Sequence, residues 1–239
     1  MSTTRLPVLF LTDLVVLPGM VVPIELDDAA RAAVDAAKAH SDGTLLVAPR
    51  LEDRYASYGV VAEIVQLGRL ATGEPAAVIK AERRVRIGSG VSGPGTALWV
   101  EAEELPEPAH ETEEVTKLAA EYKSLVIATL QRRDAWQVID TVNRLTDPST
   151  LADLAGYAPW LSDERKRQLL ETPDVMARLT ALIDWTKAYI AETEVNDKIA
   201  DDVREGMEKS QREFLLRQQL NAIRKELGED EPDGAQDYR

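Results

Sequence analysis

The sequence predicts an α+β protein, with a β-rich first part followed by an α-helical bundle and a long C-terminal helix. Short runs rich in Val, Ile and Leu, split by Gly and Pro, fill the first hundred or so residues, as strands do. After an acidic, Pro-containing stretch at 104–114, apolar residues recur at helical spacing. The third observation is the run from Glu194 to Leu227, which only Gly206 weakly interrupts.

The β-rich part contains six expected strands and one helix. The turn signal LPGM at 17–20 suits a type II turn, with Pro18 and Gly19 at its two central positions. Asp27 is the expected N-cap of the helix over 27–40. So many short strands indicate a strongly curved sheet or a small open barrel. The strands are expected at 7–11, 21–26, 44–49, 58–70, 76–88 and 96–105, with a hairpin tip at 69–74.

The second part reads as helices joined by short loops. Asp147 and Thr172 each precede a Pro, which predicts a capping residue followed by Pro at the first helical position. Ser162 is the expected start of another helix. The helices are expected at 114–133, 135–145, 149–157, 162–171 and 174–190. The predicted division is a β-rich region at 1–105, a helical region at 106–193, a long helix at 194–228 and an acidic tail at 229–239. The acidic stretch predicts that the first two regions move relative to each other.

Composition restricts the class of protein. A hydrophobic content of 44% in 239 residues is enough for a packed core. A net charge of −14 argues against nucleic acid or an anionic membrane as the main partner. The sequence has no cysteine, which suits a reducing compartment. There is no secretory signal pattern or membrane-spanning apolar run, so we expect a cytoplasmic protein.

Catalytic chemistry is poorly supported by the sequence. Its two histidines are His40, expected near a helix C-terminus, and His110, expected in the acidic stretch. No cluster of His, Asp and Glu has metal-ligand spacing. No phosphate-binding loop is present, because the glycines at 88–95 are not followed by Lys and a helix. We therefore expect no enzyme activity, catalytic residue, cofactor or metal in this chain.

Binding is better supported. Apolar residues flanking the LPGM turn either pack between strands or form an exposed edge that meets unfolded segments. A Tyr-Ala-Pro-Trp loop at 157–160 precedes a helix and is placed to present its rings. The candidate contacts to a protein substrate are Phe10, Leu17, Met20, Val22, Tyr157 and Trp160.

The last helix carries two apolar stripes on different sides. At about 100° per residue, with Val195 set to zero, the first stripe spreads from roughly 0° to 120° and the second from roughly 280° to 340°. The first stripe consists of Val195, Ile199, Val203, Met207 and Phe214. We expect Met207 and Phe214, from the first stripe, to pack on this chain's own helices. The second stripe either folds back as well or, as we expect, meets another subunit or domain. It consists of Leu216, Leu220, Ile223 and Leu227.

Several segments resemble the ATP-dependent Lon proteases. MEKSQREFLLRQQLNAIRKELGED at 207–230 closely resembles the segment preceding the ATPase module of that family, and LPVLFLTDLVVLPGMVVPIEL at 6–26 resembles its opening. YGVVAEIVQLGRLATGE and LLETPDVMARL match in order and spacing. The resemblance covers almost the whole chain. It implies a PUA-like β-rich region, a helical region and a long, coiled-coil-like helix leading to the ATPase.

The resemblance also implies a function in protein quality control. The chain would be the N-terminal part of a hexameric AAA+ protease, recruiting misfolded and degron-bearing proteins and supporting assembly. ATP, Mg and a Ser–Lys protease dyad would belong to other parts of that protein. The competing hypothesis is a stand-alone PUA-like protein that binds nucleic acid or a small ligand.

Overall fold

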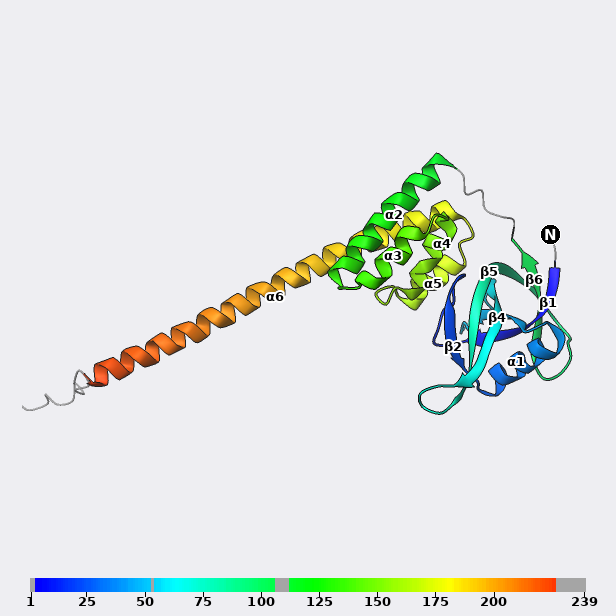
Figure 1. Cartoon of the computed structure of the whole chain (residues 1–239), viewed down its shortest axis with the longest axis horizontal. Coiled ribbons are helices and arrows are strands. Elements are labelled where there is room, and N and C mark those ends of the chain that lie inside the picture. Colours follow the sequence, from blue (N-terminus) through cyan, green and yellow to red (C-terminus); the bar gives the residue numbers. More distant parts are fainter. Residues whose placement is uncertain (1–2, 53, 106–111, 227–239) are drawn as a thin grey trace, which may run out of the picture. The chain divides into compact units, whose positions relative to one another are not determined.

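The structure is a computed structural model that describes residues 3–52, 54–105 and 112–226 (Figure 1). The chain forms two compact units, Met1–Lys187 and Ala188–Arg239. The first unit holds a six-stranded sheet and helices α1–α5 with the beginning of α6. The predicted boundary near 105 therefore lies inside one compact unit, and the four-part division remains a prediction.

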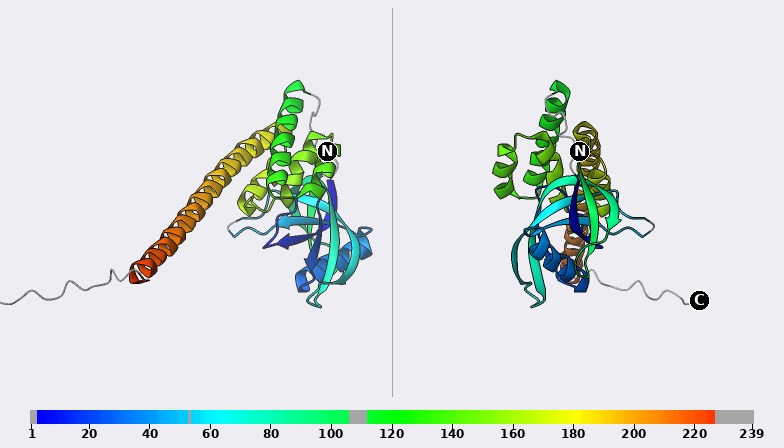
Figure 2. Two further views of the ribbon diagram at one scale, coloured as in Figure 1. Left: turned by 60° about the vertical axis from the view of Figure 1, so that its left-hand side comes forward. Right: turned by 90° about the vertical axis from the view of Figure 1, so that its right-hand side faces the viewer.

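The β-rich region is a small barrel with an additional strand, and its strands curl around one another in Figure 2. The sheet order is β2-β5-β4-β3-β1-β6, and a further β5–β6 pairing closes the last five strands into a ring. Within the described part of the chain, β1 and β3 are the one parallel pair. The strands are β1 (Thr3–Leu11), β2 (Val21–Glu25), β3 (Thr44–Pro49), β4 (Tyr58–Arg69), β5 (Pro75–Val91) and β6 (Leu98–Glu104).

Local chemistry places the turns and helix starts where the sequence predicts them. Gly19 has a φ of 83°, and Met20 N donates to Leu17 O over 3.2 Å, as a type II turn requires. The side chains of Asp27 and Ser162 accept hydrogen bonds from backbone N–H groups in the first turns of α1 and α5. Helix α1 (Asp28–His40) contacts β1 and β3.

The helical region follows its predicted order. Asp147 caps α4 with Pro148 in the first turn, as predicted. The prediction for Thr172 is wrong, because Asp174 Oδ2 accepts from Ala177 N at the start of α6 and Pro173 lies outside the helix. The elements are α2 (Glu113–Arg132), α3 (Trp136–Arg144), α4 (Pro148–Asp153), the 3-10 helix η1 (Leu154–Tyr157), α5 (Asp163–Leu170) and α6 (Val175–Glu226).

Helix α6 is continuous over 52 residues, where the sequence suggested two helices. Its first turns belong to the first unit and the rest to the second. The expectation that Met207 and Phe214 pack on the chain's own helices is wrong, because both side chains are exposed. The physical reason is that Gly206 does not break the helix, and an unbroken helix cannot turn back on its own beginning.

The first unit has two apolar clusters. The smaller one takes residues from all five barrel strands, as the inside of a closed barrel does. The larger one runs without a break from α1 and the sheet, through the LPGM turn, into helices α2–α6. This shared core argues against the expected independent motion of the β-rich and helical regions, since separating them would expose its apolar side chains to water.

Candidate functional site

A groove of about 510 Å³ on the β-rich region is the candidate site. Strands β1 and β3 run parallel, with Phe10 opposite Ala48, so both strands finish at the same end of the barrel. Arg50 N donates to Leu11 O over 2.7 Å and holds the two exits together. The start of α1 and the segment before β6 complete the walls. The apolar lining consists of Val8, Leu9, Phe10, Ala29, Ala32, Pro49, Leu51, Tyr55, Ala56, Ala97 and Leu98.

Two aromatic rings and an aliphatic side chain give the groove its exposed apolar surface. Phe10 is partly buried, and its ring centroid lies 6.0 Å from that of Tyr55, with the rings tilted by 49°. Tyr55 is 83% exposed and Leu98 63% exposed. Exposed large apolar groups beside a hollow are typical of a binding surface for an apolar ligand segment.

The charged groups at the groove are one carboxylate, Glu52, and two guanidinium groups, Arg50 and Arg54. Arg54 Nη2 donates to Glu171 Oε1 over 2.8 Å, which ties this wall to the end of α5. Among the described residues, no three His, Cys, Asp or Glu side chains lie close enough together to hold a metal ion. A mostly apolar lining with a few charged groups at its border is suited to binding.

The structure distributes the predicted substrate contacts over different environments. Phe10 lies in the groove. Leu17, Met20 and Val22 are buried in the larger apolar cluster, because the LPGM turn packs inward, so they present no surface to a ligand. Tyr157 is half-exposed, and its hydroxyl accepts from Val21 N over 2.7 Å.

Trp160 is partly buried and packs against the larger cluster. The Tyr-Ala-Pro-Trp loop is thus not part of the groove.

Sequence reasoning missed Tyr55 and Leu98. Tyr55 lies between two strands in the run RLEDRYASYG, where an aromatic residue among charged residues is a signal of surface exposure. Leu98 is the first residue of β6, and the next two residues, Trp99 and Val100, are both buried. No alternation of apolar and polar residues therefore marks Leu98 as exposed.

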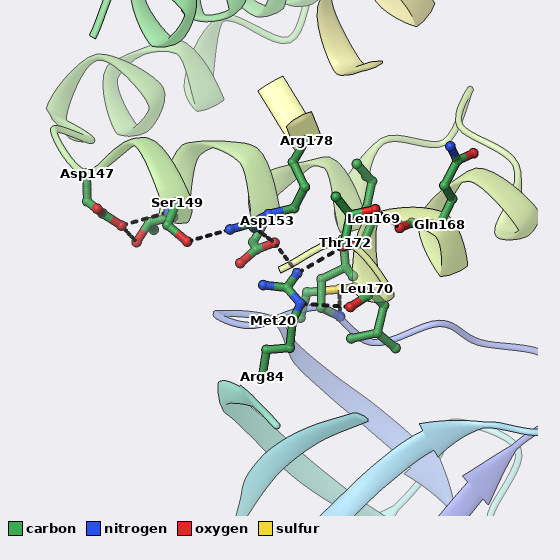
Figure 3. Close-up of polar contacts among 12 residues, drawn as sticks. Met20, Arg84, Asp147, Ser149, Asp153, Gln168, Leu169, Leu170, Thr172 and Arg178 are labelled. Carbon is green, nitrogen blue, oxygen red and sulfur yellow. Dashed lines mark hydrogen bonds and ion pairs between the residues drawn. The ribbon is translucent and has the colours of Figure 1, made fainter. Parts of the chain in front are cut away.

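A second pocket of about 480 Å³ lies where β5 meets α4 and α6, and it has a charged lining. Figure 3 shows the Asp153 carboxylate between the guanidinium groups of Arg84 and Arg178. Arg84 Nη2 donates to Asp153 Oδ1 over 2.9 Å, and Arg178 Nη1 donates to the same oxygen. All three side chains are buried.

Further hydrogen bonds of this network join β5 to α5 and α6 to α4. Arg84 Nε donates to Leu170 O over 2.9 Å, and Arg178 Nη2 donates to Ser149 Oγ over 2.9 Å. Burial lowers the pKa of Arg84, although the Asp153 carboxylate opposes that change. Burial also raises the pKa of Tyr122, with a further contribution from Asp153, so its phenol stays neutral. The network joins β5 to α4, α5 and the start of α6.

Gly156 is required for close packing between η1 and the LPGM turn. A Cβ atom at this position would lie 2.3 Å from the buried Met20 Sδ. We therefore expect Gly156→Ala to lower the free energy of unfolding by ~1–3 kcal/mol, the usual cost of overpacking a core. Urea titration followed by circular dichroism measures this change.

The matched control is Gly206→Ala, which makes the same change inside α6, where nothing lies within 4 Å. That variant should gain helix stability, because Ala favours a helix by ~1 kcal/mol over Gly. Equal stability of the Gly156→Ala variant and the unmodified chain would contradict the packing argument.

The second stripe lies on the exposed surface of α6. Leu216, Leu220 and Ile223 are all about half-exposed. Leu227 lies outside the described residues. None of the described helices is long and apolar enough to cross a membrane.

Comparison with known proteins identifies the family. Residues 5–188 match the family described as "ATP-dependent protease La (LON) substrate-binding domain". Over 98% of its length the chain is 67% identical to Lon protease of Mycolicibacterium smegmatis and 59% identical to that of Salinispora arenicola. In both cases the aligned part is 30% of the relative, so the chain spans under a third of their length.

Solved structures agree with the sequence comparison. The N-terminal domain of Mycobacterium avium complex Lon protease is 64% identical, with a TM-score of 0.74 over 77% of this chain and 98% of that one. A Lon N-terminal domain protein from Xanthomonas campestris, at 20% identity and a TM-score of 0.54, shares the fold over 76% of this chain and 98% of that one. With its matching sequence, barrel and helices, the chain belongs to the Lon substrate-binding domain family.

Proposed function

We propose that this chain captures unfolded and degron-bearing proteins through the groove between Phe10, Tyr55 and Leu98. The observation that carries the proposal is an exposed aromatic ring beside an apolar hollow, in a member of a substrate-binding family. Unfolded segments expose apolar side chains that folded proteins bury, so such a surface selects them.

The longer protein to which this chain would belong is, in our proposal, a cytoplasmic ATP-dependent serine protease. ATP, Mg and the Ser–Lys dyad would be held outside this chain, which binds and does not catalyse. The relatives that support this proposal are Lon proteases of more than three times the aligned length. A stand-alone nucleic-acid-binding function is not favoured, because a net charge of −14 repels phosphate.

The exposed second stripe of α6 would meet the same helix of a neighbouring subunit or the ATPase module. Leu216, Leu220 and Ile223 are spaced four and three residues apart, which keeps them on one seam. Large apolar side chains on one seam of a helix are expected to be covered in an assembled hexamer.

Substitution of the groove aromatics tests the substrate-binding proposal. Tyr55→Ser and Phe10→Ser should each weaken binding of a chemically unfolded model protein about fivefold or more, as loss of a central aromatic anchor does. The unmodified chain should bind with a Kd of ~10–100 µM, typical of a single weak contact. Fluorescence anisotropy measures both.

The matched control is Val138→Ser, which removes another exposed apolar side chain, on α3, that does not line the groove. Its affinity should equal that of the unmodified chain. If Tyr55→Ser and Phe10→Ser both bind the unfolded protein as tightly as Val138→Ser and the unmodified chain do, the groove is not the substrate site.

A further inference from the structure

The outer half of strand β4 is paired on one side only. Strand β3 accompanies β4 from Val60 to Glu63, whereas β5 continues beside it to Arg69. Among the described residues, no strand pairs with β4 beyond Glu63 on the β3 side. The β4–β5 hairpin projects past the rest of the barrel in Figure 1. This segment is therefore a free sheet edge.

The hairpin turn determines which main-chain groups point outward along this edge. Leu70 N donates to Glu74 O over 2.8 Å, and Gly73 N donates to Leu70 O over 2.9 Å, so both main-chain groups of Leu70 point toward the arm of the hairpin that leads into β5. Hydrogen-bonded and non-hydrogen-bonded pairs alternate in an antiparallel ladder. Gly68 therefore bonds to β5, while Leu67 and Arg69 direct their N–H and C=O groups away from it.

The same edge carries exposed apolar side chains. Val65, at a register shift between β4 and β5, is 57% exposed, and Leu67 is 44% exposed. Outward-directed N–H and C=O groups next to large apolar side chains match what an added strand requires, namely hydrogen bonds along its backbone and apolar contacts at alternate residues.

The other free edge, along β2, is blocked. The Val21 N–H group already donates to the Tyr157 hydroxyl. Pro23 has no N–H group, and prolines on edge strands prevent pairing with further strands. One edge of this sheet is thus closed to an added strand, and the β4 edge is open.

We propose that the β4 edge from Val65 to Arg69 binds an extended segment of unfolded polypeptide by strand addition. This inference rests on the proposed function and adds to it that the substrate backbone is recognised. Unfolded chains present unpaired N–H and C=O groups, which is the chemistry that this edge offers.

A second copy of the chain is a poorer occupant. Edge-to-edge pairing over about five residues would bury far less than the roughly 1,200 Å² of a stable interface. Two chains of net charge −14 also repel each other.

Proline substitution separates backbone from side-chain recognition. Leu67→Pro and Arg69→Pro each remove one outward N–H group without removing a bond to β5. Each should weaken binding of a fluorescent peptide of alternating valine and threonine about fivefold, as loss of a net hydrogen bond does. The matched control, Leu67→Ala, keeps the N–H group and should change the affinity less than about twofold. Circular dichroism and the melting temperature verify that the variants fold.

A second measurement leaves the protein unchanged. The same peptide, N-methylated at alternate residues along one edge, should bind the unmodified chain about fivefold more weakly or worse, because it cannot donate to β4. The inference is overturned by equal binding of the methylated peptide, by unchanged affinity of both proline variants, or by an equal effect of Leu67→Ala and Leu67→Pro. A dimer of the unmodified chain that Leu67→Pro dissociates would assign the edge to a second copy and overturn it too.

The two proposals fail in different ways. If the unmodified chain binds neither the peptide nor an unfolded protein, both are overturned. If Tyr55→Ser weakens binding while the folded proline variants bind normally, the groove is the substrate site and the edge is not.

Discussion

Replacing Asp153 with Asn should lower the free energy of unfolding by roughly 3–5 kcal/mol. The carboxylate accepts hydrogen bonds from the guanidinium groups of both Arg84 and Arg178, and all three side chains are buried. The amide has nearly the same shape but no charge, so two buried cations would lose the anion between them. Urea unfolding followed by circular dichroism measures the loss.

The matched control is Glu171→Gln, which makes the same chemical change in another Arg–carboxylate pair that joins the β-rich and helical regions. Arg54 and Glu171 are partly exposed, with side-chain exposures of 55% and 29%. Surface ion pairs contribute at most ~1 kcal/mol, so this variant should lose no more than that. Similar losses for Asp153→Asn and Glu171→Gln would contradict the importance of burial.

The Asp153 network also bears on the proposed function. Arg84 lies on β5, and Arg178 lies in the first turns of α6. Their shared carboxylate fixes the start of α6 relative to the barrel that carries both the groove and the free β4 edge. Asp153→Asn should therefore weaken this attachment more than it alters the barrel itself. The smaller apolar cluster stabilises the barrel independently of Asp153.

Much of the fold could be predicted because the local signals agree with one another. Alternating apolar residues and the turn at Gly19 predict the strands, and Asp27, Asp147 and Ser162 predict helix starts that the structure confirms. The start of α6 was missed because Asp174 competes with Thr172 as the capping residue. The closed barrel could not be predicted, since the β5–β6 pairing depends on tertiary contacts.

The candidate site was less predictable than the fold. Phe10 and the buried Leu17 look alike in sequence, because both are apolar residues of β-rich segments. Leu17 is buried because the LPGM turn packs against η1, through the close approach of Met20 and Gly156, whereas Phe10 lies near the end of β1 beside the groove. Likewise, the Arg84–Asp153 bond joins residues 69 positions apart, and no local pattern indicates it. The family resemblance predicts a binding role but does not locate the surface.

Replacing Leu216, Leu220 and Ile223 together with Ser should abolish assembly of the longer protein that we propose. Burying a Leu or Ile side chain contributes ~1.5–3 kcal/mol, so the three together contribute roughly 5–9 kcal/mol per helix if another helix covers them. The same triple variant of the isolated chain should keep its melting temperature, because all three side chains are exposed there. Sedimentation velocity of the long form and thermal unfolding of the isolated chain measure the two outcomes.

The matched control is the triple Ser variant of Val195, Ile199 and Val203, on the first stripe, which are equally exposed. These residues are spaced by four throughout, so each step turns about 40° around the helix and they form no straight seam. The second stripe alternates four and three, which keeps one seam facing a partner. The control should therefore assemble nearly normally. Assembly lost in the control but kept in the second-stripe variant would assign the interface to the first stripe instead.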